Sequence, residues 1–263
     1  MSVTIRDLRS FKQRHERFIM LTAYDFPTAR ILDEAGVPVI LVGDSLANNV
    51  LGYETTLPVT MEEMLHHCRA VARGVKNALI VGDMPFLSYQ TSIEEGIRNA
   101  GRFLKEGAAH AVKLEGPMFE LCGALVERGI PVMGHLGLTP QSVHAMGGYR
   151  VQGRTEEDAG RLLEEAHALD KAGIFTLVLE GVPATLAAHI SETVSVPTIG
   201  IGAGPHCDGQ VLVLSDLLGL GGGHYPKFAK PYADLHGEII RAVTAFREDV
   251  VAGVFPDEAH SYH

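Results

Sequence analysis

The sequence predicts a single-domain (β/α)8 barrel of the α/β class, and three observations support that prediction. Eight short apolar runs of the kind that form buried parallel strands are spread along the 263 residues. Segments with the apolar spacing of amphipathic helices separate most of these runs. The length also fits, because a barrel of this type usually has about 250 residues in one domain. We therefore expect residues 1–263 to form one barrel domain, with a short N-terminal helix and a C-terminal helix followed by a polar tail.

Each predicted strand is apolar at successive positions, as expected where a strand is buried on both faces. Six of the eight also carry a polar side chain near the C-terminal end. Packing of a buried strand does not require a polar side chain at that position. Because the C-terminal ends of all barrel strands meet at one mouth, we expect these polar groups to converge there. The predicted strands are Phe18–Tyr24, Val37–Asp44, Ala78–Asp83, Ala109–Glu115, Ile130–His135, Phe175–Glu180, Pro197–Ile201 and Gln210–Leu214.

Helices are predicted where apolar spacing lies between cap and stop residues. Thr60 and Glu63, for example, have the spacing of a capping box. Two long loops, Asn48–Val59 and Gly137–Arg154, follow the second and fifth strands. The predicted helices are Thr4–His15, Pro27–Ala35, Met61–Gly74, Thr91–Leu104, Met118–Glu127, Glu156–Ala172, Pro183–Thr193 and Tyr232–Ala252.

A doubly wound open sheet is the alternative fold for this alternation of strands and helices. Such a sheet normally has a glycine-rich turn after its first strand. Here the first turn reads TAYDFPT and contains no glycine, which favours the barrel. Glycine is dense between Gly202 and Gly223, so the number of strands depends most on that segment.

Composition and charge exclude several classes of function. Hydrophobic residues make up 46% and charged residues 21% of the chain, as in globular enzymes. The formal net charge of -10 argues against nucleic acid or an anionic membrane as a partner, and no apolar stretch approaches the roughly 18 residues of a membrane span. The three cysteines, Cys68, Cys122 and Cys207, form neither a disulfide framework nor a zinc-binding spacing, so we expect a reducing, cytoplasmic location.

Three acids, Asp44, Asp83 and Glu115, lie at three successive strand ends. Carboxylates crowded at one barrel mouth repel each other and would not all stay ionised unaided. A divalent cation resolves this repulsion, and oxygen-only ligands favour magnesium over zinc. The alternative is that each acid caps a helix or pairs with a lysine. Three acids in corresponding positions favour the metal site.

Lys113 and Glu115 alternate along the fourth strand, so their side chains point to the same face. An inward lysine must be paired or functional, because burying its charge alone is costly. We rank three roles for Lys113 in the order carboxylate binder, ion pair and Schiff base. A Schiff base needs a lysine of lowered pKa, and neighbouring acids act in the opposite direction.

Four further residues are candidates at the same mouth. Glu180 ends the sixth strand apart from the metal-binding acids, and a carboxylate in an apolar setting suits proton abstraction; the alternative is a cap for the next helix. His135 is either a site residue or a hydrogen-bonded core histidine. Ser45 and Tyr24 are either hydrogen-bond donors to a bound acid or ordinary loop caps.

A series of motifs runs through almost the whole chain: TAYD, LVGDSL, TLPVT, GDMPF, VKLEG, GHLGLTPQS, GGYRVQGR, LVLEGVP, IGIGAG, DGQVLV, KFAKPY and EAHSYH. LVGDSL, VKLEG, GHLGLTPQS and LVLE in this order are highly specific. With them the chain resembles the ketopantoate hydroxymethyltransferase family. The resemblance implies a barrel of the phosphoenolpyruvate/pyruvate superfamily type and a homodecamer.

The resemblance also implies roles for the candidate residues. Asp44 and Asp83 would hold one Mg²⁺, with Glu115 as a further ligand, directly or through water. Asp44, Ser45, Asp83 and Lys113 would contact the 2-oxo acid, 3-methyl-2-oxobutanoate, in a site lined by His135. Glu180 would accept the C3 proton and so form a magnesium-stabilised enolate. The enolate would attack the methylene of 5,10-methylenetetrahydrofolate and give 2-dehydropantoate, on the route to pantothenate and coenzyme A.

Two alternative functions stay open from the sequence. One is a magnesium-dependent carbon–carbon lyase of the same superfamily, which often relies on a cysteine in a mobile loop. None of the cysteines falls at a predicted strand end, which argues against it. The other is a binding barrel that has the metal site without turnover. It would be expected to lack a base or a ligand, and none is missing.

Overall fold

The computed structural model describes residues 2–223 and 225–262. The chain divides into two compact units, residues 1–212 and residues 213–263. We describe each unit by itself.

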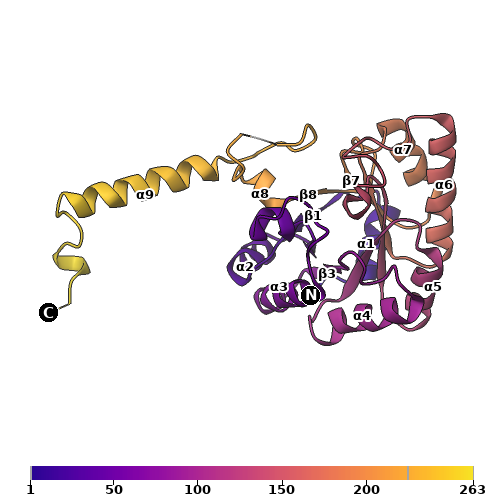
Figure 1. Ribbon diagram of the computed structural model, residues 1–263, viewed down its shortest axis with the longest axis horizontal. Coiled ribbons are helices and arrows are strands. Elements are labelled where there is room, and N and C mark those ends of the chain that lie inside the picture. Colours follow the sequence, from indigo (N-terminus) through magenta and orange to yellow (C-terminus); the bar gives the residue numbers. More distant parts are fainter. Residues whose placement is uncertain (1, 224, 263) are drawn as a thin grey trace. The chain divides into compact units, whose positions relative to one another are not determined.

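The first unit is a closed barrel in which each strand pairs in parallel with its sequence neighbours and β8 pairs with β1 (Figure 1). This confirms the predicted (β/α)8 barrel and excludes the open sheet. The observed strands are β1 Phe18–Thr22, β2 Val39–Val42, β3 Leu79–Asp83, β4 Ala111–Glu115, β5 Val132–Gly137, β6 Thr176–Glu180, β7 Thr198–Ile201 and β8 Gly209–Leu212.

The helices of this unit begin mostly at the predicted caps. The Thr60 side chain accepts a hydrogen bond from the Glu63 backbone, and the Glu63 side chain accepts one from the Thr60 backbone, as the capping box requires. The α-helices are α1 Ile5–Gln13, α2 Phe26–Glu34, α3 Met61–Gly74, α4 Ile93–Lys105, α5 Phe119–Glu127, α6 Glu156–Lys171 and α7 Ala184–Thr193.

Residues 202–208 join β7 to β8 without a helix, and none was predicted there. Two details differ from the sequence prediction. The loop after β2 is not wholly irregular, because Ala47–Leu51 forms a π-helical turn, η1. Several strands are also shorter than predicted: β2 ends at Val42, and Asp44 lies two residues beyond its last ladder position.

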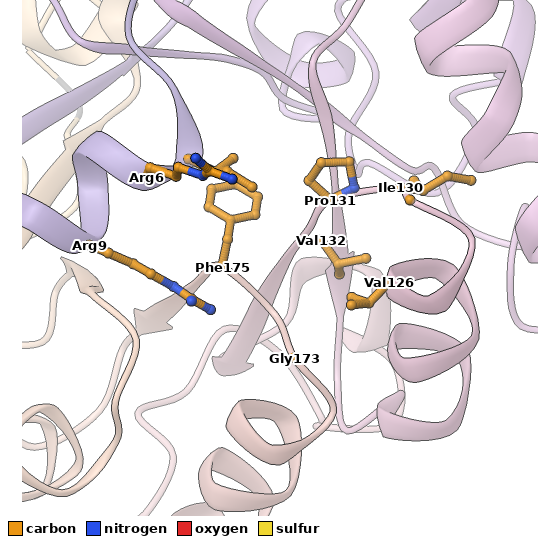
Figure 2. A pocket seen from close by; sticks show the side chains of 10 residues that line it. Arg6, Arg9, Val126, Ile130, Pro131, Val132, Gly173 and Phe175 are labelled. Carbon is orange, nitrogen blue, oxygen red and sulfur yellow. The ribbon is translucent and has the colours of Figure 1, made fainter.

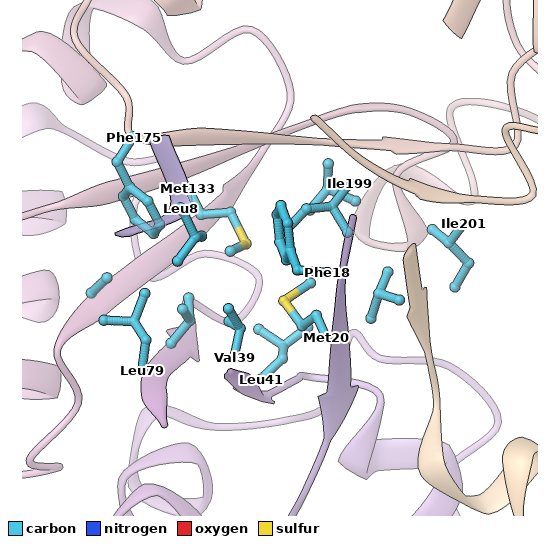
Figure 3. Packing of buried hydrophobic residues seen from close by; sticks show 14 residues of the cluster. Leu8, Phe18, Met20, Val39, Leu41, Leu79, Met133, Phe175, Ile199 and Ile201 are labelled. Atoms are coloured by element: carbon cyan, nitrogen blue, oxygen red, sulfur yellow. The ribbon is translucent and has the colours of Figure 1, made fainter. Parts of the chain in front are cut away.

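An apolar cluster fills the N-terminal half of the barrel (Figure 3). Most of it comes from residues at or near strand starts, such as Val39, Leu79 and Phe175. Leu8 of α1 is fully buried in the same cluster and closes it from outside the sheet. Large apolar side chains therefore occupy one end of the barrel, and polar groups are left to the other end.

The second unit contains a short helix, α8 Leu214–Leu217, a long helix, α9 Leu235–Val251, and a 3-10 turn, η3 Glu258–His260. Helix α9 starts where the Asp234 side chain accepts a hydrogen bond from the Gly237 backbone. None of its residues is buried, although it carries several large apolar side chains. Over the described ranges, no helix of the protein is long and apolar enough to cross a membrane.

Candidate active site

Strand register brings the predicted polar residues together in neighbouring pairs. Asp83 of β3 is the register partner of Lys113 of β4, and Glu115 of β4 is the partner of His135 of β5. Residues two apart on a strand share a face. Lys113 and Glu115 therefore continue inward from Ala111, which belongs to the interior apolar cluster. The polar residues form the layer above that cluster.

Asp44 joins this layer from the loop just beyond β2. Its backbone N–H donates to Asp83 Oδ2 at 3.2 Å, and its side chain is buried with only 4% of the residue exposed. Next to it, Ser45 Oγ lies 2.9 Å from the hydroxyl of the buried Tyr24. The structure therefore places the predicted pair Tyr24 and Ser45 in contact beside the acids.

Lys113 forms the ion pair that ranked second among its predicted roles. Its Nζ lies 2.7 Å from Asp83 Oδ1 and 3.8 Å from Glu115 Oε1, and only 5% of its side chain is exposed. Burial lowers the pKa of Lys113, but the charges of Asp83 and Glu115 outweigh burial and raise it overall. The amine is therefore held protonated, which disfavours nucleophilic chemistry.

His135 lies between the acids of β4 and β6. Its Nδ1 is 3.6 Å from Glu115 Oε1 and 3.4 Å from Lys113 Nζ, and its Nε2 is 3.3 Å from Glu180 Oε2. The Nε2 contact lacks hydrogen-bond alignment, so this buried nitrogen has no hydrogen-bond partner among the described residues. Burial and Lys113 lower the pKa of His135, but Glu115 and Glu180 outweigh them and raise it to about 9.

Glu180 ends β6 in register with Gly137 of β5. A Cβ on Gly137, which has a φ of +94°, would lie 2.2 Å from the Glu180 carbonyl oxygen, so only glycine permits this approach. The side chain of Glu180 is 16% exposed. The expected apolar setting of Glu180 is wrong, because His135 is its neighbour.

The three acids do not share one electrostatic environment. Burial, followed by the charges of Asp83 and Glu115, raises the pKa of Asp44 well above its usual value. Burial also raises the pKa of Asp83, against the effect of Lys113. Burial acts the same way on Glu115, but contacts with His135 and Lys113 outweigh it and lower the pKa. Ionising all three acids would therefore place more negative charge in the layer than Lys113 balances, and Asp44 is the acid whose ionisation its surroundings oppose most.

These acids are not already arranged as a metal cage. Across residues 2–223 and 225–262, no group of three or more histidine, cysteine, aspartate or glutamate side chains has metal-binding geometry. The oxygen-only donors nevertheless fit a hard cation, whose charge would favour the ionised form of Asp44. A cation here would therefore need further ligands from water or substrate.

Two buried residues of this layer, Gln141 and Tyr89, were missed by the sequence reasoning. Gln141 Nε2 donates to Asp44 Oδ2 at 2.9 Å, and the Gln141 backbone N–H donates to Glu115 Oε2 at 2.9 Å. Tyr89 accepts a hydrogen bond from the Glu115 backbone N–H and donates to Gln141 Oε1 at 2.7 Å. Both lie on loops after strands, and only that position could have suggested them.

A hollow of about 280 Å³ lies at the opposite end of the barrel, near the starts of β5 and β6 (Figure 2). Arg6 and Arg9 of α1 line it together with Phe175. Gly129 and Gly173, which follow the ends of α5 and α6, also line it. Positive side chains suit the carbonyl ends of helices, so these arginines have a structural explanation there.

Comparison with solved structures supports the same type of barrel. A putative phosphonomutase from Burkholderia cenocepacia J2315 matches with a TM-score of 0.65 and 12% identity, over 93% of this chain and 98% of that one. A phosphonopyruvate hydrolase in complex with oxalate and Mg²⁺ matches with a TM-score of 0.63 and 12% identity, over 99% and 92%. At this identity the likeness shows the fold alone, a parallel (β/α)8 barrel.

Sequence relatives are much closer. A 3-methyl-2-oxobutanoate hydroxymethyltransferase from Thermoanaerobacter sp. (strain X514) is 55% identical over 99% of this chain and 96% of its own length. One from Thermotoga sp. (strain RQ2) is 57% identical over 99% and 96%. The family model for ketopantoate hydroxymethyltransferase matches residues 2–258. The chain therefore belongs to the ketopantoate hydroxymethyltransferase family and is an enzyme of that family.

Proposed function

We propose that this enzyme transfers a hydroxymethyl group from 5,10-methylenetetrahydrofolate to 3-methyl-2-oxobutanoate and so forms 2-dehydropantoate, for pantothenate and coenzyme A synthesis. Family membership and the names of its relatives support the reaction. The observation that carries the proposal is the polar layer at the barrel mouth. It has acids and a lysine on one side and the pair His135 and Glu180, with 3.3 Å between Nε2 and Oε2, on the other.

The donor set supports magnesium as the cation. Asp44 and Asp83 would hold the ion directly, and water or substrate would complete its shell, as is usual for Mg²⁺. Glu115 would act through water, with its Oε2 accepting the Gln141 backbone N–H and its Oε1 facing Lys113 and His135. When bound, the ion supplies Lewis-acid polarisation of the keto and carboxylate oxygens, which acidifies the neighbouring C3–H.

The chain's own residues would bind and orient the oxo acid. Lys113 would contribute a fixed positive charge toward its oxygens, held in place by Asp83. Ser45 would donate a hydrogen bond from the mouth, with its hydroxyl positioned by Tyr24 at 2.9 Å. Positioning of this kind fixes which face of C3 meets the base.

Glu180 would then remove the C3 proton through its carboxylate, which keeps some exposure at the mouth. His135 would stay beside it and hold the carboxylate oriented. The carbon that has lost its proton would attack the folate methylene. The two methylene–nitrogen bonds would break, water would supply the hydroxyl oxygen, and tetrahydrofolate would leave. The folate would lie over the mouth beside the loop after β5, where burial, Asp44 and Glu180 raise the pKa of Tyr149.

Exchange of the C3 proton tests this assignment without folate. We expect wild-type enzyme with Mg²⁺ to exchange the C3 proton of the oxo acid in D₂O, followed by NMR. Glu180→Gln should lose exchange by roughly 10²–10⁴-fold while still binding the oxo acid. Glu165→Gln is the matched control, because Glu165 has the same 16% side-chain exposure but lies on α6. Parent-rate exchange in Glu180→Gln would remove Glu180 from the role and leave His135 as the candidate.

The buried cysteines argue against the lyase alternative. Cys68 lies on α3, Cys122 lies on α5 and Cys207 precedes β8, each with no more than 2% exposure. Burial raises the pKa of all three thiols, to about 12 for Cys122. A lyase that uses a thiolate at the mouth would need a different residue from any of these. A lyase or a binding barrel should also show little or no C3 exchange.

We further propose a homo-oligomer in the cytoplasm, with the decamer of the family resemblance as the expected form. The apolar side chains exposed on α9, including Ile240, Val243 and Phe246, support association, because such residues are usually covered. The unpaired cysteines fit a reducing compartment. Sedimentation equilibrium of the full chain would measure the state, and a monomer at assay concentrations would contradict the oligomer.

A further inference from the structure

Gln141 reaches into the polar layer although it lies on a loop. It belongs to the 3-10 turn η2, Pro140–Ser142, after β5, and only 5% of it is exposed. Its side-chain nitrogen donates to Asp44 Oδ2 and to the Met84 carbonyl oxygen, each at 2.9 Å. Its backbone N–H donates to Glu115 Oε2 at 2.9 Å. One loop residue therefore holds carboxylates that come from two different strand ends.

The orientation of the Gln141 amide is fixed by its other side. Its Oε1 accepts from the Tyr89 hydroxyl at 2.7 Å and from Gln90 Nε2 at 3.2 Å. If the amide turned over, its oxygen would face two acceptors, Asp44 Oδ2 and the Met84 carbonyl, and its NH₂ would face Gln90 Nε2. The observed orientation is therefore the one that satisfies all four contacts.

This arrangement decides which oxygen each acid can offer to a ligand. Asp44 Oδ2 is occupied by Gln141, whereas no hydrogen bond to Oδ1 occurs within the described part of the chain. Glu115 Oε2 is occupied in the same way, and its Oε1 faces Lys113 at 3.8 Å and His135 at 3.6 Å. The side-chain amide of Gln141 suits a position beside Asp44, because it is uncharged and donates two hydrogen bonds. A further acid here would add repulsion, and a cationic side chain would compete with the bound ion.

We infer that Gln141 is a positioning residue of the active site: it turns Asp44 so that Oδ1 is presented to the cation and the oxo acid, and it holds Glu115 toward Lys113 and His135. The inference rests on the proposed function, since it assigns Gln141 a role at the proposed cation site. Groups that orient metal ligands typically change metal affinity or activity by about 10–100-fold when they are replaced.

The test is the affinity of the full-length enzyme for Mn²⁺, measured from the EPR signal of the free ion. Gln141→Met keeps the side-chain length and removes the side-chain N–H donors to Asp44 and the Met84 carbonyl, while the backbone N–H to Glu115 stays. We expect its Kd for Mn²⁺ to rise by about 10–100-fold, and the water-proton relaxation per bound ion to rise as water replaces Asp44. Gln90→Met is the matched control: it removes a contact with the same Oε1 but none with an acid, so its Kd should equal that of wild type.

Each outcome decides the inference. A folded Gln141→Met with wild-type Mn²⁺ affinity would overturn it while leaving the proposed function intact. A wild-type enzyme that binds no Mn²⁺ would instead contradict the proposed cation site, and the role of Gln141 with it. If Gln141→Met does not fold, Tyr89→Phe takes its place, because it removes the hydroxyl that anchors Oε1 and accepts the Glu115 backbone N–H. Its Kd for Mn²⁺ should rise above that of wild type, and an unchanged Kd would overturn the inference.

Discussion

Replacing Lys113 with methionine should destabilise the barrel far more than an ordinary loss of an ion pair. The Nζ of Lys113 lies 2.7 Å from Asp83 and 3.8 Å from Glu115, and these side chains are no more than 5% exposed. Methionine fills similar space but leaves the acids without their lysine. Removing one partner of a buried pair costs about 3–5 kcal/mol, which lowers Tm by roughly 6–20 °C for a domain of this size.

Lys12→Met is the control for this prediction. Lys12 also pairs with an acid, Asp208 at 2.9 Å, but the side chains are 18% and 19% exposed. Solvent-exposed pairs contribute about 0.2–1 kcal/mol, so the expected loss for Lys12→Met lies near the upper end of that range. Thermal unfolding followed by circular dichroism at pH 7 without divalent cations compares the two variants. Equal Tm losses would refute the reasoning that Lys113 compensates buried acids.

The dependence on pH and cations gives the same prediction a second measurement. The folded-state pKa of Lys113 is raised, so its contribution is complete below the ordinary lysine pKa and is lost only as pH rises through the raised value. The full loss should therefore be present at pH 7. It should shrink in acid, as the acids become protonated. Added Mg²⁺ should recover more stability in Lys113→Met than in wild type, because a ligand that binds the folded state stabilises it.

Three further predictions concern the metal, the amine and a structural carboxylate. Activity should disappear in excess chelator and return with Mg²⁺, and full activity in chelator would contradict the need for a cation. Asp44→Ala or Asp83→Ala should weaken Mn²⁺ binding more than Glu115→Ala does. Borohydride added with the oxo acid should trap no covalent adduct on the enzyme. A mass increase at Lys113 would overturn its role as a fixed positive charge. The pKa of Asp33 is lowered because four N–H donors from residues 76–78 outweigh burial. Asp33→Asn should therefore lower the free energy of unfolding, measured with urea at pH 7, by about 1–3 kcal/mol. The difference from wild type should disappear as pH falls through the lowered folded-state pKa of Asp33. A difference that persists in acid would disprove this role of the carboxylate.

The fold and the positions of the strand-end residues followed from periodicity and topology. Apolar runs of strand length separated by helical segments predict a parallel barrel, and its strands must share one mouth. Alternation along β4 then places Lys113 and Glu115 on one face without knowledge of their neighbours. Such arguments succeed because they depend on the backbone, which repeats regularly. They give the layer in which a residue lies, and they leave open which residue it contacts.

Contacts between strands depended on register, which the sequence did not reveal. Glu180 was expected to stand apart in an apolar setting, but the pairing of Gly137 with Glu180 and of Glu115 with His135 puts His135 beside it. A shift of one residue would have turned the side chain to the other face. The link between β7 and β8 is a loop, and no helix was predicted there. Seven residues can connect neighbouring strands as a loop, and the sequence there contains two glycines, Gly202 and Gly204.

Gln141 marks the limit of the sequence reasoning most clearly. It lies in a loop without periodicity, 97 residues from Asp44 and 26 from Glu115 along the chain, and glutamine is not among the residue types that suggest catalysis or metal binding. Yet the acids gain their orientation from it, because a strand fixes where a carboxylate starts but not which oxygen it presents. The strands thus set the positions of the carboxylates, and the loop after β5 sets their orientation. Substitutions in this loop can change cation affinity while every proposed metal ligand stays in place.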